Sequence, residues 1–407
     1  MPVLDDYGPI VGKDTIAEIR ILGDRLKGHV VRNINSTATG GGVAEILHRM
    51  IPLLCELGVD ARWDVIKGGD QFFWVTKKIH NALHGANTEL SSDEVTIFLE
   101  TNRENLESMD LSGDVIFVHD PQPIGLIESR GDGDGRKWLW RCHVDVSQRN
   151  AAVWQFLKPY VERYDAAVFS SPSFSPPLAI RQFMVTPSID PLSDKNRELS
   201  DKEIEKALAP FKLDLEKPIV LQVSRFDFLK DPVGVIQAFR MAKQSADCQL
   251  VLAGGTATDD PESDIVLKQV MEAADGDRDI HVLAIPPGSD IVINALQRSA
   301  SVVMQKSLRE GFGLTVSEAL WKGKPVIASA VGGIPLQIKN RYHGMLCHSV
   351  EGAAYALRQV LNSPDFGARL GENGREHVRQ NYLLTRHLKE YLLMFISIAH
   401  PDDVIFL

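Results

Sequence analysis

The feature that most limits the fold of this chain is a regular alternation of short apolar runs with longer amphipathic stretches. Such alternation is typical of β-α-β units, in which helices join parallel strands. In the first half, strands are predicted at residues 30–35, 60–66, 115–119, 139–144 and 166–170, and a helix at about 43–57. The pattern predicts an α/β fold built on parallel sheets.

A second series of the same kind follows a break in composition near residue 190. Pro187–Pro191 predicts a turn, and the charged stretch Asp194–Leu208 predicts a helix. Strands are then predicted at 219–224, 248–253, 280–283, 301–304 and 325–328, and helices at 233–243, 291–298 and 315–321. Since 407 residues exceed what one hydrophobic core usually supports, two domains are expected.

We therefore predict two Rossmann-like, doubly wound domains, residues 1–190 and 191–385, that face a central cleft. Ligands of such sheets bind at the carboxyl ends of the strands, so one ligand can lie between the two domains. The last residues, 386–407, predict a helix that packs back on the first domain. Its apolar part, residues 391–399, is too short to span a membrane.

Composition limits the location and the partners of the chain. The N-terminus has no basic region leading into an apolar stretch, which predicts no signal peptide. The four cysteines are far apart and form no C-x-x-C pair, a pattern typical of reduced thiols in the cytoplasm. A net charge of −10 argues against a nucleic-acid surface. We expect a cytoplasmic protein with neither a membrane nor a nucleic acid as partner.

A glycine-rich turn lies between the first predicted strand and its helix. It reads Thr39-Gly40-Gly41-Gly42-Val43-Ala44-Glu45. Glycines let the backbone approach an anion, and a helix start supplies N–H groups to bind it. The run lacks the G-x-G-x-x-G spacing, so a dinucleotide site is not indicated. A tight turn without a ligand fits the sequence equally well.

Two cations follow the first strand of the second half. Arg225 and Lys230 stand in the segment Ser224-Arg225-Phe226-Asp227-Phe228-Leu229-Lys230. A guanidinium and an ammonium at a strand end are suited to a diphosphate. The alternative is ordinary solvated surface charge.

The most specific segment pairs two carboxylates eight positions apart, Glu310-Gly311-Phe312-Gly313-Leu314-Thr315-Val316-Ser317-Glu318-Ala319. Backbone N–H groups from Gly313 to Val316 can meet phosphate oxygens at a helix start. Glu310 precedes the helix and Glu318 lies inside it, so they should reach different hydroxyls of one ligand, one on a sugar and one on a ribose. The alternative for Glu318 is a solvated helix residue.

These motifs resemble the donor site of retaining glycosyltransferases of family 4, whose pattern is S-R-F-D-x-x-K followed by E-x7-E. Four further segments resemble trehalose glycosyltransferring synthases and the related fungal-type retaining trehalose phosphorylases: N-S-T-A-T-G-G-G-V-A-E-I-L-H (35–48), F-F-x-V-T-K-K-I-H-N-A-L-H-G (72–85), V-H-D-P-Q-P (118–123) and L-W-R-C-H-V-D (139–145). The likeness runs from about residue 30 to the end and implies the GT-B fold.

The resemblance implies a donor site for a nucleotide sugar. Arg225 and Lys230 would hold the diphosphate, and Glu310 and Glu318 would bind the transferred glucose and the ribose. Further donor contacts are implied for Gly41 and Gly42 from the first domain, and for Phe312, Gly313, Leu314 and Thr315.

The same resemblance implies an acceptor side in the first domain. His143 matches a family histidine near the reacting face of the donor sugar, and Asp120 matches a carboxylate beside the acceptor. Gln122, His80 and Asn81 are further acceptor candidates. A histidine such as His143 is on its own more often structural, and residues 72–84 fit an amphipathic core helix equally well.

The implied reaction transfers glucose from an NDP-glucose, with ADP or UDP as the nucleotide, to free glucose with retention. The product is α,α-trehalose and the reaction is reversible. The sequence offers no carboxylate pair flanking the anomeric carbon, so the resemblance implies front-face attack rather than a double displacement. No cofactor is required and no metal cluster is evident, although Mg²⁺ can accompany the nucleotide. A homodimer is compatible with the sequence.

Alternatives remain open at this level. A retaining trehalose phosphorylase, which uses glucose 1-phosphate, shares the N-terminal motifs. A non-catalytic protein that binds sugar nucleotides is permitted by fold alone. Glucose 6-phosphate as acceptor would need cations for its phosphate, and Arg62, Lys67, Lys77 and Lys78 could supply them.

Overall fold

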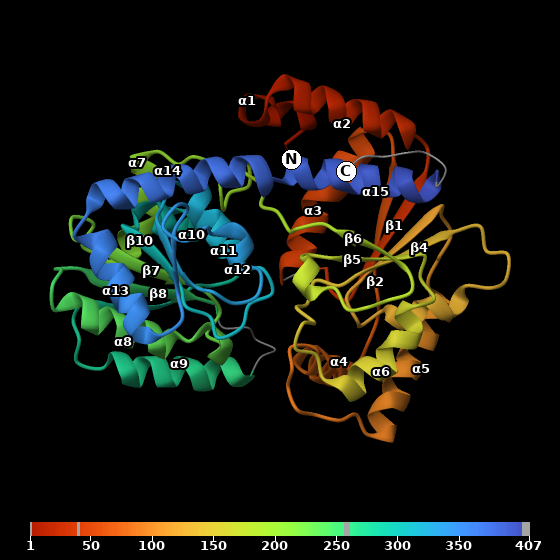
Figure 1. Cartoon of the computed structure of the whole chain (residues 1–407), viewed down its shortest axis with the longest axis horizontal. Coiled ribbons are helices and arrows are strands. Elements are labelled where there is room, and N and C mark those ends of the chain that lie inside the picture. Colours follow the sequence, from red (N-terminus) through yellow and green to blue (C-terminus); the bar gives the residue numbers. More distant parts are fainter. Residues whose placement is uncertain (1, 39–40, 256–260, 401–407) are drawn as a thin grey trace. The chain divides into compact units, whose positions relative to one another are not determined.

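The computed structural model describes residues 2–38, 41–255 and 261–400 of the chain. It divides into two compact units (Figure 1). Unit 1 contains residues 1–188 and 384–407, and unit 2 contains residues 189–383. Both divisions lie within two residues of the boundaries expected from the sequence.

Unit 1 is built on a six-stranded parallel sheet. Its strands are β1 (Val30–Asn35), β2 (Asp60–Val65), β3 (Val115–His119), β4 (Lys137–Arg141), β5 (Ala166–Phe169) and β6 (Arg181–Met184). They lie in the order β2-β1-β3-β4-β5-β6. The direction of winding changes between β1 and β3, and a crevice for a ligand is expected at the carboxyl ends of these two strands.

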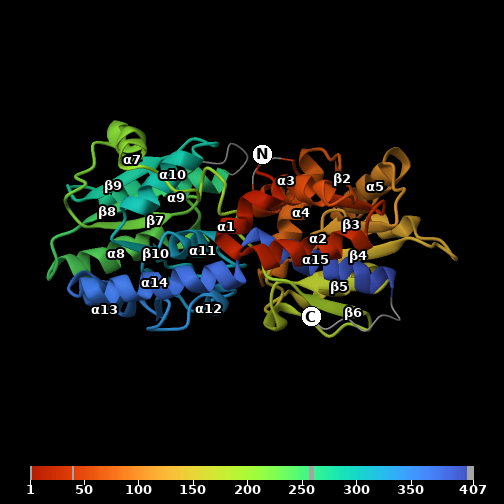
Figure 2. The ribbon, with the colours of Figure 1, turned by 90° about the horizontal axis from the view of Figure 1, so that it is seen from above.

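Helices cover both faces of this sheet. One face carries α2 (Lys13–Arg25), α3 (Gly41–Glu56) and α15 (Leu384–Ala399), and the other carries α4 (Asp70–Leu83), α5 (Ser92–Ser108) and α6 (Ala151–Val161) (Figure 1). The N-terminal turn α1 (Gly8–Val11) leads into α2. Helix α15 packs against α2 and α3, and Figures 1 and 2 show α2 and α15 side by side. The last helix of the chain thus completes the first unit.

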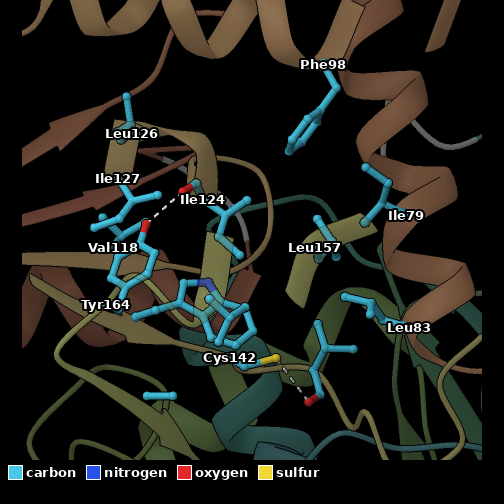
Figure 3. Packing of buried hydrophobic residues seen from close by; sticks show 14 of the residues in the cluster. Ile79, Leu83, Phe98, Val118, Ile124, Leu126, Ile127, Cys142, Leu157 and Tyr164 are labelled. Carbon is cyan, nitrogen blue, oxygen red and sulfur yellow. Dashed lines mark hydrogen bonds between the residues drawn. The ribbon is translucent and has the colours of Figure 1, made fainter. Parts of the chain in front are cut away.

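A large hydrophobic cluster of unit 1 lies between the sheet and the face covered by α4, α5 and α6 (Figure 3). Val118 of β3 packs there with Phe98 of α5 and Leu157 of α6. The buried Tyr164 hydroxyl donates to the Ile124 carbonyl at 2.9 Å, so the ring fills the core without leaving its hydroxyl unpaired. This packing fixes β3 and β4, whose ends carry the polar residues described below.

Unit 2 repeats the architecture. Its strands are β7 (Ile219–Val223), β8 (Gln249–Gly254), β9 (Ile280–Ala284), β10 (Val302–Gln305), β11 (Val326–Ser329) and β12 (Met345–Cys347), all parallel, in the order β12-β11-β10-β7-β8-β9. Here the winding changes between β7 and β10. The predicted α/β class with two doubly wound sheets is confirmed.

The helices of unit 2 pack in groups around the sheet (Figure 1). Helix α8 (Pro232–Lys243) contacts α9 (Pro261–Ala274) and α13 (Val350–Leu361). Helix α11 (Leu314–Trp321) contacts α14 (Pro364–Asn381) and the short α12 (Ile334–Gln337), and α10 (Asp290–Ser299) contacts α7 (Asp201–Leu208). Helix α11 begins just after the loop that follows β10.

Two local predictions were wrong. Residues 194–200 are not helical, because Ser200 caps the start of α7 and accepts from the Glu203 N–H at 3.4 Å. The Asn196 amide donates to the Asp190 carbonyl at 3.0 Å, which holds the preceding residues in a loop. Strand β4 ends at Arg141 rather than at residue 144, because the His143 N–H donates to a side chain, Asp120, instead of to a neighbouring strand.

None of the helices within the described ranges combines the length and apolarity needed to cross a membrane.

Candidate functional site

An ion pair joins the ends of β7 and β10 in unit 2. The Lys230 Nζ lies 2.9 Å and 2.7 Å from the two carboxylate oxygens of Glu310. The loops that carry them are also joined through their backbones, since the Leu308 N–H donates to the Leu229 carbonyl at 2.8 Å. The two residues stand 80 positions apart in the sequence and meet because the sheet changes its winding between these two strands.

Glu310 is the acceptor in a small network of donors. The Gln305 amide and the Ser307 hydroxyl each donate to Oε2 at 3.1 Å, in addition to Lys230. Glu310 and Ser307 are both buried. A carboxylate with this many donors, one of them charged, is held in one orientation. The network leaves Glu310 suited to accepting hydrogen bonds from a sugar hydroxyl.

Glycines fix the backbone around Glu310. Gly313 caps the start of α11 with a φ of +81°, a conformation that favours glycine. Gly332, in the loop after β11, has a φ of +55° and packs directly on the Glu310 carbonyl. Its neighbour Gly333 donates from its N–H to the Gly311 carbonyl at 2.9 Å. The segment Glu310–Gly313 is therefore clamped between two loops.

The start of α11 has fewer available N–H groups than the sequence predicted. The Val316 N–H donates to the Gly313 carbonyl, three residues earlier, at 2.9 Å, so this N–H is already occupied and does not offer the phosphate contact expected of it. The Phe312 ring is buried and lies 5.5 Å from the ring of Tyr382. Leu314 and Thr315 are partly exposed. Phe312 thus supports the loop from inside with its ring.

Glu318 lies inside α11 and is only 4% exposed, which rules out the alternative of a solvated helix residue. The Gln297 amide donates to its Oε2 at 3.1 Å, and the Lys195 ammonium lies 3.9 Å from Oε1. Below it, the buried Lys322 donates to the Asn196 side chain at 2.9 Å, and burial lowers the pKa of Lys322 to about 7. Glu310 and Glu318 therefore have separate sets of donors.

Arg225 differs sharply from Lys230 in its surroundings. Its side chain is 63% exposed, and its nearest carboxylate, that of Asp227, is 3.7 Å away. The Lys230 side chain is 19% exposed and bound to Glu310. Arg225 consequently presents its charge to solvent, whereas the charge of Lys230 is largely compensated.

The acceptor-side candidates of unit 1 gather at the ends of β3 and β4. Asp120 follows β3 with a φ of +65° and is held by three hydrogen bonds. Its Oδ1 accepts from the His143 N–H at 2.8 Å, its N–H donates to the Arg141 carbonyl at 2.7 Å, and its carbonyl accepts from the Trp140 indole at 2.9 Å. Desolvation raises the pKa of Asp120 to about 6.

Two histidines form a hydrogen-bonded chain beside Asp120. The Asn33 amide donates to the Arg62 carbonyl at 3.4 Å, so its oxygen accepts from His119 Nε2 at 3.2 Å. His119 Nδ1 then accepts from His143 Nε2 at 3.1 Å. Burial lowers the pKa of His119 to about 3 and that of His143 well below its usual value, so both rings are neutral. This chain leaves His143 Nδ1 unprotonated and able to accept a hydrogen bond.

The structure brings Asp120 and His143 together, and beside them lie Asn33 and Arg141, which the sequence did not single out. Their signal was polarity inside strands: V-V-R-N-I-N and K-W-L-W-R carry buried polar residues in otherwise apolar runs. His119 is structural in the sense that it orients His143.

The remaining candidates lie on separate elements. His80 is on the last turn of α4 and meets the ring of His84 edge-on, with ring centroids 4.7 Å apart, and Asn81 is exposed. Residues 70–83 bury one face in the core, as the core-helix alternative predicted. Gln122 carries a buried side-chain oxygen without a partner in the described part of the chain. Gly41 and Gly42 begin α3, whereas Thr39 and Gly40 lie outside the described residues.

Both units of the chain are similar to known protein families. The family description "Trehalose synthase, N-terminal domain" matches residues 33–176, and "Glycosyl transferases group 1" matches residues 203–377. The trehalose synthase of Rubrobacter xylanophilus is 43% identical over 403 residues, which cover 97% of each chain. That of Pyrococcus horikoshii is 43% identical over 402 residues, covering 97% of this chain and 96% of the relative.

The chain belongs to the trehalose synthase family. It is accordingly a glycosyltransferase, and the resemblance found in its motifs is confirmed. More distant relatives include the trehalose phosphorylase of Pleurotus pulmonarius, 28% identical over 456 residues that cover 98% of this chain and 62% of the relative.

The fold of this member of the trehalose synthase family is similar to the folds of other solved structures. The sucrose-phosphate synthase of Thermosynechococcus elongatus aligns with a TM-score of 0.71 at 20% identity, covering 91% of this chain and 99% of that structure. The UDP-forming α,α-trehalose-phosphate synthase of Burkholderia xenovorans aligns with a TM-score of 0.73 at 14% identity, covering 92% and 100%. At these identities the likeness concerns the fold, and it confirms the GT-B fold.

Proposed function

We propose that this protein is a retaining glucosyltransferase that makes α,α-trehalose from an NDP-glucose, with ADP or UDP as nucleotide, and free glucose, reversibly. The observation that carries the proposal is the Lys230–Glu310 pair at the switch point of unit 2, which places a fixed carboxylate and a cation where a sugar diphosphate is expected to bind. Relatives named trehalose synthase, 43% identical over almost the whole chain, support the choice of product.

In the proposed donor site, Glu310 accepts hydroxyl hydrogens of the transferred glucose and Glu318 those of the ribose. Arg225 carries the diphosphate. Lys230 joins it, because an ammonium has three N–H groups and the two Glu310 oxygens take at most two of them. The N–H groups at the start of α11, around Leu314 and Thr315, and those of Gly41 and Gly42 add donors for the phosphates.

The proposed chemistry is a front-face displacement. A glucose hydroxyl attacks the anomeric carbon on the side of the leaving group, the bond from that carbon to the diphosphate oxygen breaks, and the hydroxyl proton passes to this oxygen. Catalysis is then chiefly electrostatic stabilisation of the leaving diphosphate by preorganised donors. Asp120 and the unprotonated nitrogen of His143 accept hydroxyl hydrogens of the sugars and orient them.

Free glucose as acceptor is supported by the ion pairs of two of the four cations that could hold an acceptor phosphate. Arg62 is bound by Asp60 through two hydrogen bonds of 3.0 Å and 2.7 Å, and Lys78 is bound by both oxygens of Glu94 at 2.8 Å and 2.9 Å. A phosphate near Asp120 would in addition meet a like charge.

We propose no required cofactor, because the cations of unit 2 supply the charge that a divalent ion supplies elsewhere, and Mg²⁺ would enter only with the nucleotide. The proposed partners are NDP-glucose, glucose and trehalose, with a cytoplasmic location, and the homodimer stays a prediction. The second candidate is a trehalose phosphorylase, favoured only by relatives of that name at 28–30% identity.

One activity matrix tests the proposal. UDP-glucose, ADP-glucose and glucose 1-phosphate are each combined with glucose and with glucose 6-phosphate, and products are identified by NMR. We expect trehalose and free NDP, with kcat/KM at least about tenfold higher for glucose than for glucose 6-phosphate, a difference of about 1.4 kcal/mol. A preference for glucose 6-phosphate would reject the acceptor assignment, and turnover of glucose 1-phosphate without a nucleotide would favour the phosphorylase.

A further inference from the structure

Arg141 is a completely buried cation at the end of β4. One of its guanidinium nitrogens, Nη2, donates to the Val185 carbonyl at 2.7 Å. The other two, Nε and Nη1, have no hydrogen-bond partner among the residues that the structure describes, and no carboxylate there forms an ion pair with Arg141. Burying a charge without a paired carboxylate is costly, so a chain that keeps one at a site is expected to use it.

The last helix of unit 1 covers this guanidinium. The Arg141 Cζ lies 5.6 Å from the centroid of the Tyr391 ring, within the range of a cation–π contact. His387, one turn earlier on α15, packs against Tyr391 with ring centroids 4.4 Å apart and is bonded through Nδ1 to the Ser188 hydroxyl at 2.9 Å. Helix α15 thus supplies aromatic and neutral groups around Arg141, and burial lowers the pKa of His387 well below its usual value.

On its other side Arg141 adjoins the acceptor-side residues. Its carbonyl accepts the Asp120 N–H, and it pairs with His119 in the register of β3 and β4. His143 follows two positions later. The positive charge of Arg141 lowers the pKa of all three neighbours, opposing desolvation at Asp120 and adding to desolvation at both histidines.

We propose that Arg141 is a positioning residue for glucosyl transfer: buried at the end of β4 and covered by α15, it places a fixed positive charge beside Asp120 and the His119–His143 pair. Asp120 then keeps its carboxylate as an acceptor of hydroxyl hydrogens, and His143 keeps the unprotonated nitrogen that such contacts need. The roles of Asp120 and His143 in this proposal rest on the proposed function. The effect of Arg141 on the protonation of these residues is independent of it.

The other groups near this cluster do not compensate the charge of Arg141. Tyr391 has a buried hydroxyl whose pKa is raised by desolvation, and burial also raises that of the Cys142 thiol, so both are neutral. Arg386, on α15, is paired with Glu390 at 2.5 Å. The charge of Arg141 also opposes the rise in the pKa of Tyr391 and of the Cys142 thiol, and Asp120 is the carboxyl group of this cluster whose pKa it lowers.

The test compares Arg141→Lys, which keeps the charge, with Arg141→Gln and Arg141→Met, which remove it. A matched control is Arg20→Met, which removes one exposed positive charge from α2 of the same unit. Folding is checked by melting. Two readouts follow: the pH profile of kcat/KM for the acceptor, and the ring titration of His119 and His143 by NMR. Affinity for the nucleotide sugar, which the proposed function assigns chiefly to residues of unit 2, is measured as a second control.

Without the charge, the acid limb of the acceptor profile should move to higher pH by at least about half a unit, and the two histidines should titrate at higher pH. Arg141→Lys and Arg20→Met should leave both near wild type. Uncharged variants that fold and show the wild-type limb and titrations would overturn the proposal, as would Arg141→Lys behaving like Arg141→Gln. If the wild type makes no trehalose, the proposed function fails, and the histidine titrations still decide the effect of Arg141.

Discussion

Replacing Gly332 by alanine tests whether the position of Glu310 controls transfer. A Cβ at Gly332 would lie 2.7 Å from the carbonyl carbon of Glu310, and closer still to its oxygen. Real Cβ atoms do not approach other heavy atoms within 3.0 Å, and the obstacle is backbone rather than a flexible side chain. The Glu310 backbone or the loop after β11 must therefore shift, by on the order of 1 Å at the reacting sugar.

A second glycine separates this shift from the cost of the backbone conformation. Gly276, between α9 and β9, has a φ of +76°, and a Cβ there would meet nothing within 4 Å. Gly276→Ala should lower the free energy of unfolding by about 1–2 kcal/mol through left-handed strain alone, with kcat/KM unchanged. Gly332→Ala carries the same strain plus the shift.

For Gly332→Ala we expect a loss of about 100-fold in kcat/KM, since a misplacement of about 1 Å in a catalytic constellation costs on that order. Urea unfolding and initial rates of NDP release are measured on both variants, at a temperature where both are folded. Equal kinetic behaviour of the two variants would show that the contact between Gly332 and Glu310 does not position the carboxylate, and the reasoning would fail.

Two further predictions concern the donor residues. Arg225→Ala and Lys230→Ala should each cost about 2–4 kcal/mol of transition-state stabilisation, measured as kcat/KM, and only Lys230→Ala should also lower the free energy of unfolding, because it leaves the buried Glu310 without its cation. Near-normal turnover in both would remove them from the donor site. Glu318→Ala should mainly raise the KM for the nucleotide sugar and Glu310→Ala should mainly lower kcat, and identical kinetic defects would refute the separate roles.

The parts of the fold that could be predicted are those in which a buried strand makes a continuous apolar run. Strands β1 and β3 were predicted with their observed bounds. Strand β6 was missed because it lies at the sheet edge with Phe183 as its only buried residue, and β12 was missed because it has three residues. A short strand or a strand at the sheet edge lacks the continuous apolar run by which buried strands are predicted from sequence.

Candidate site residues could be predicted where the chemistry of a single side chain suggests its ligand. They could not be predicted where their role depends on contact with a residue far away in the sequence. Arg225, Lys230, Glu310 and Glu318 follow from strand ends and carboxylate spacing. That Lys230 binds Glu310 could not be read, because the contact depends on the order of β7 and β10 in the sheet. Arg141 was not predicted for the same reason, since the residue that packs on its guanidinium, Tyr391, lies on α15 at the other end of the chain.

The pairing of Lys230 with Glu310 also implies different roles for the proposed donor-site residues. A cation bound to a carboxylate contributes little net charge at a distance, so Lys230 alone would attract a diphosphate weakly. Arg225 is exposed and lies 3.7 Å from its nearest carboxylate, so it keeps most of its charge for an approaching phosphate. The pair instead holds the Glu310 side chain in one orientation, which in the proposed reaction lowers the cost of ordering it against the sugar. In the proposed donor site, attraction of the nucleotide sugar would therefore rest on Arg225 and the start of α11, and orientation of its glucose on Glu310.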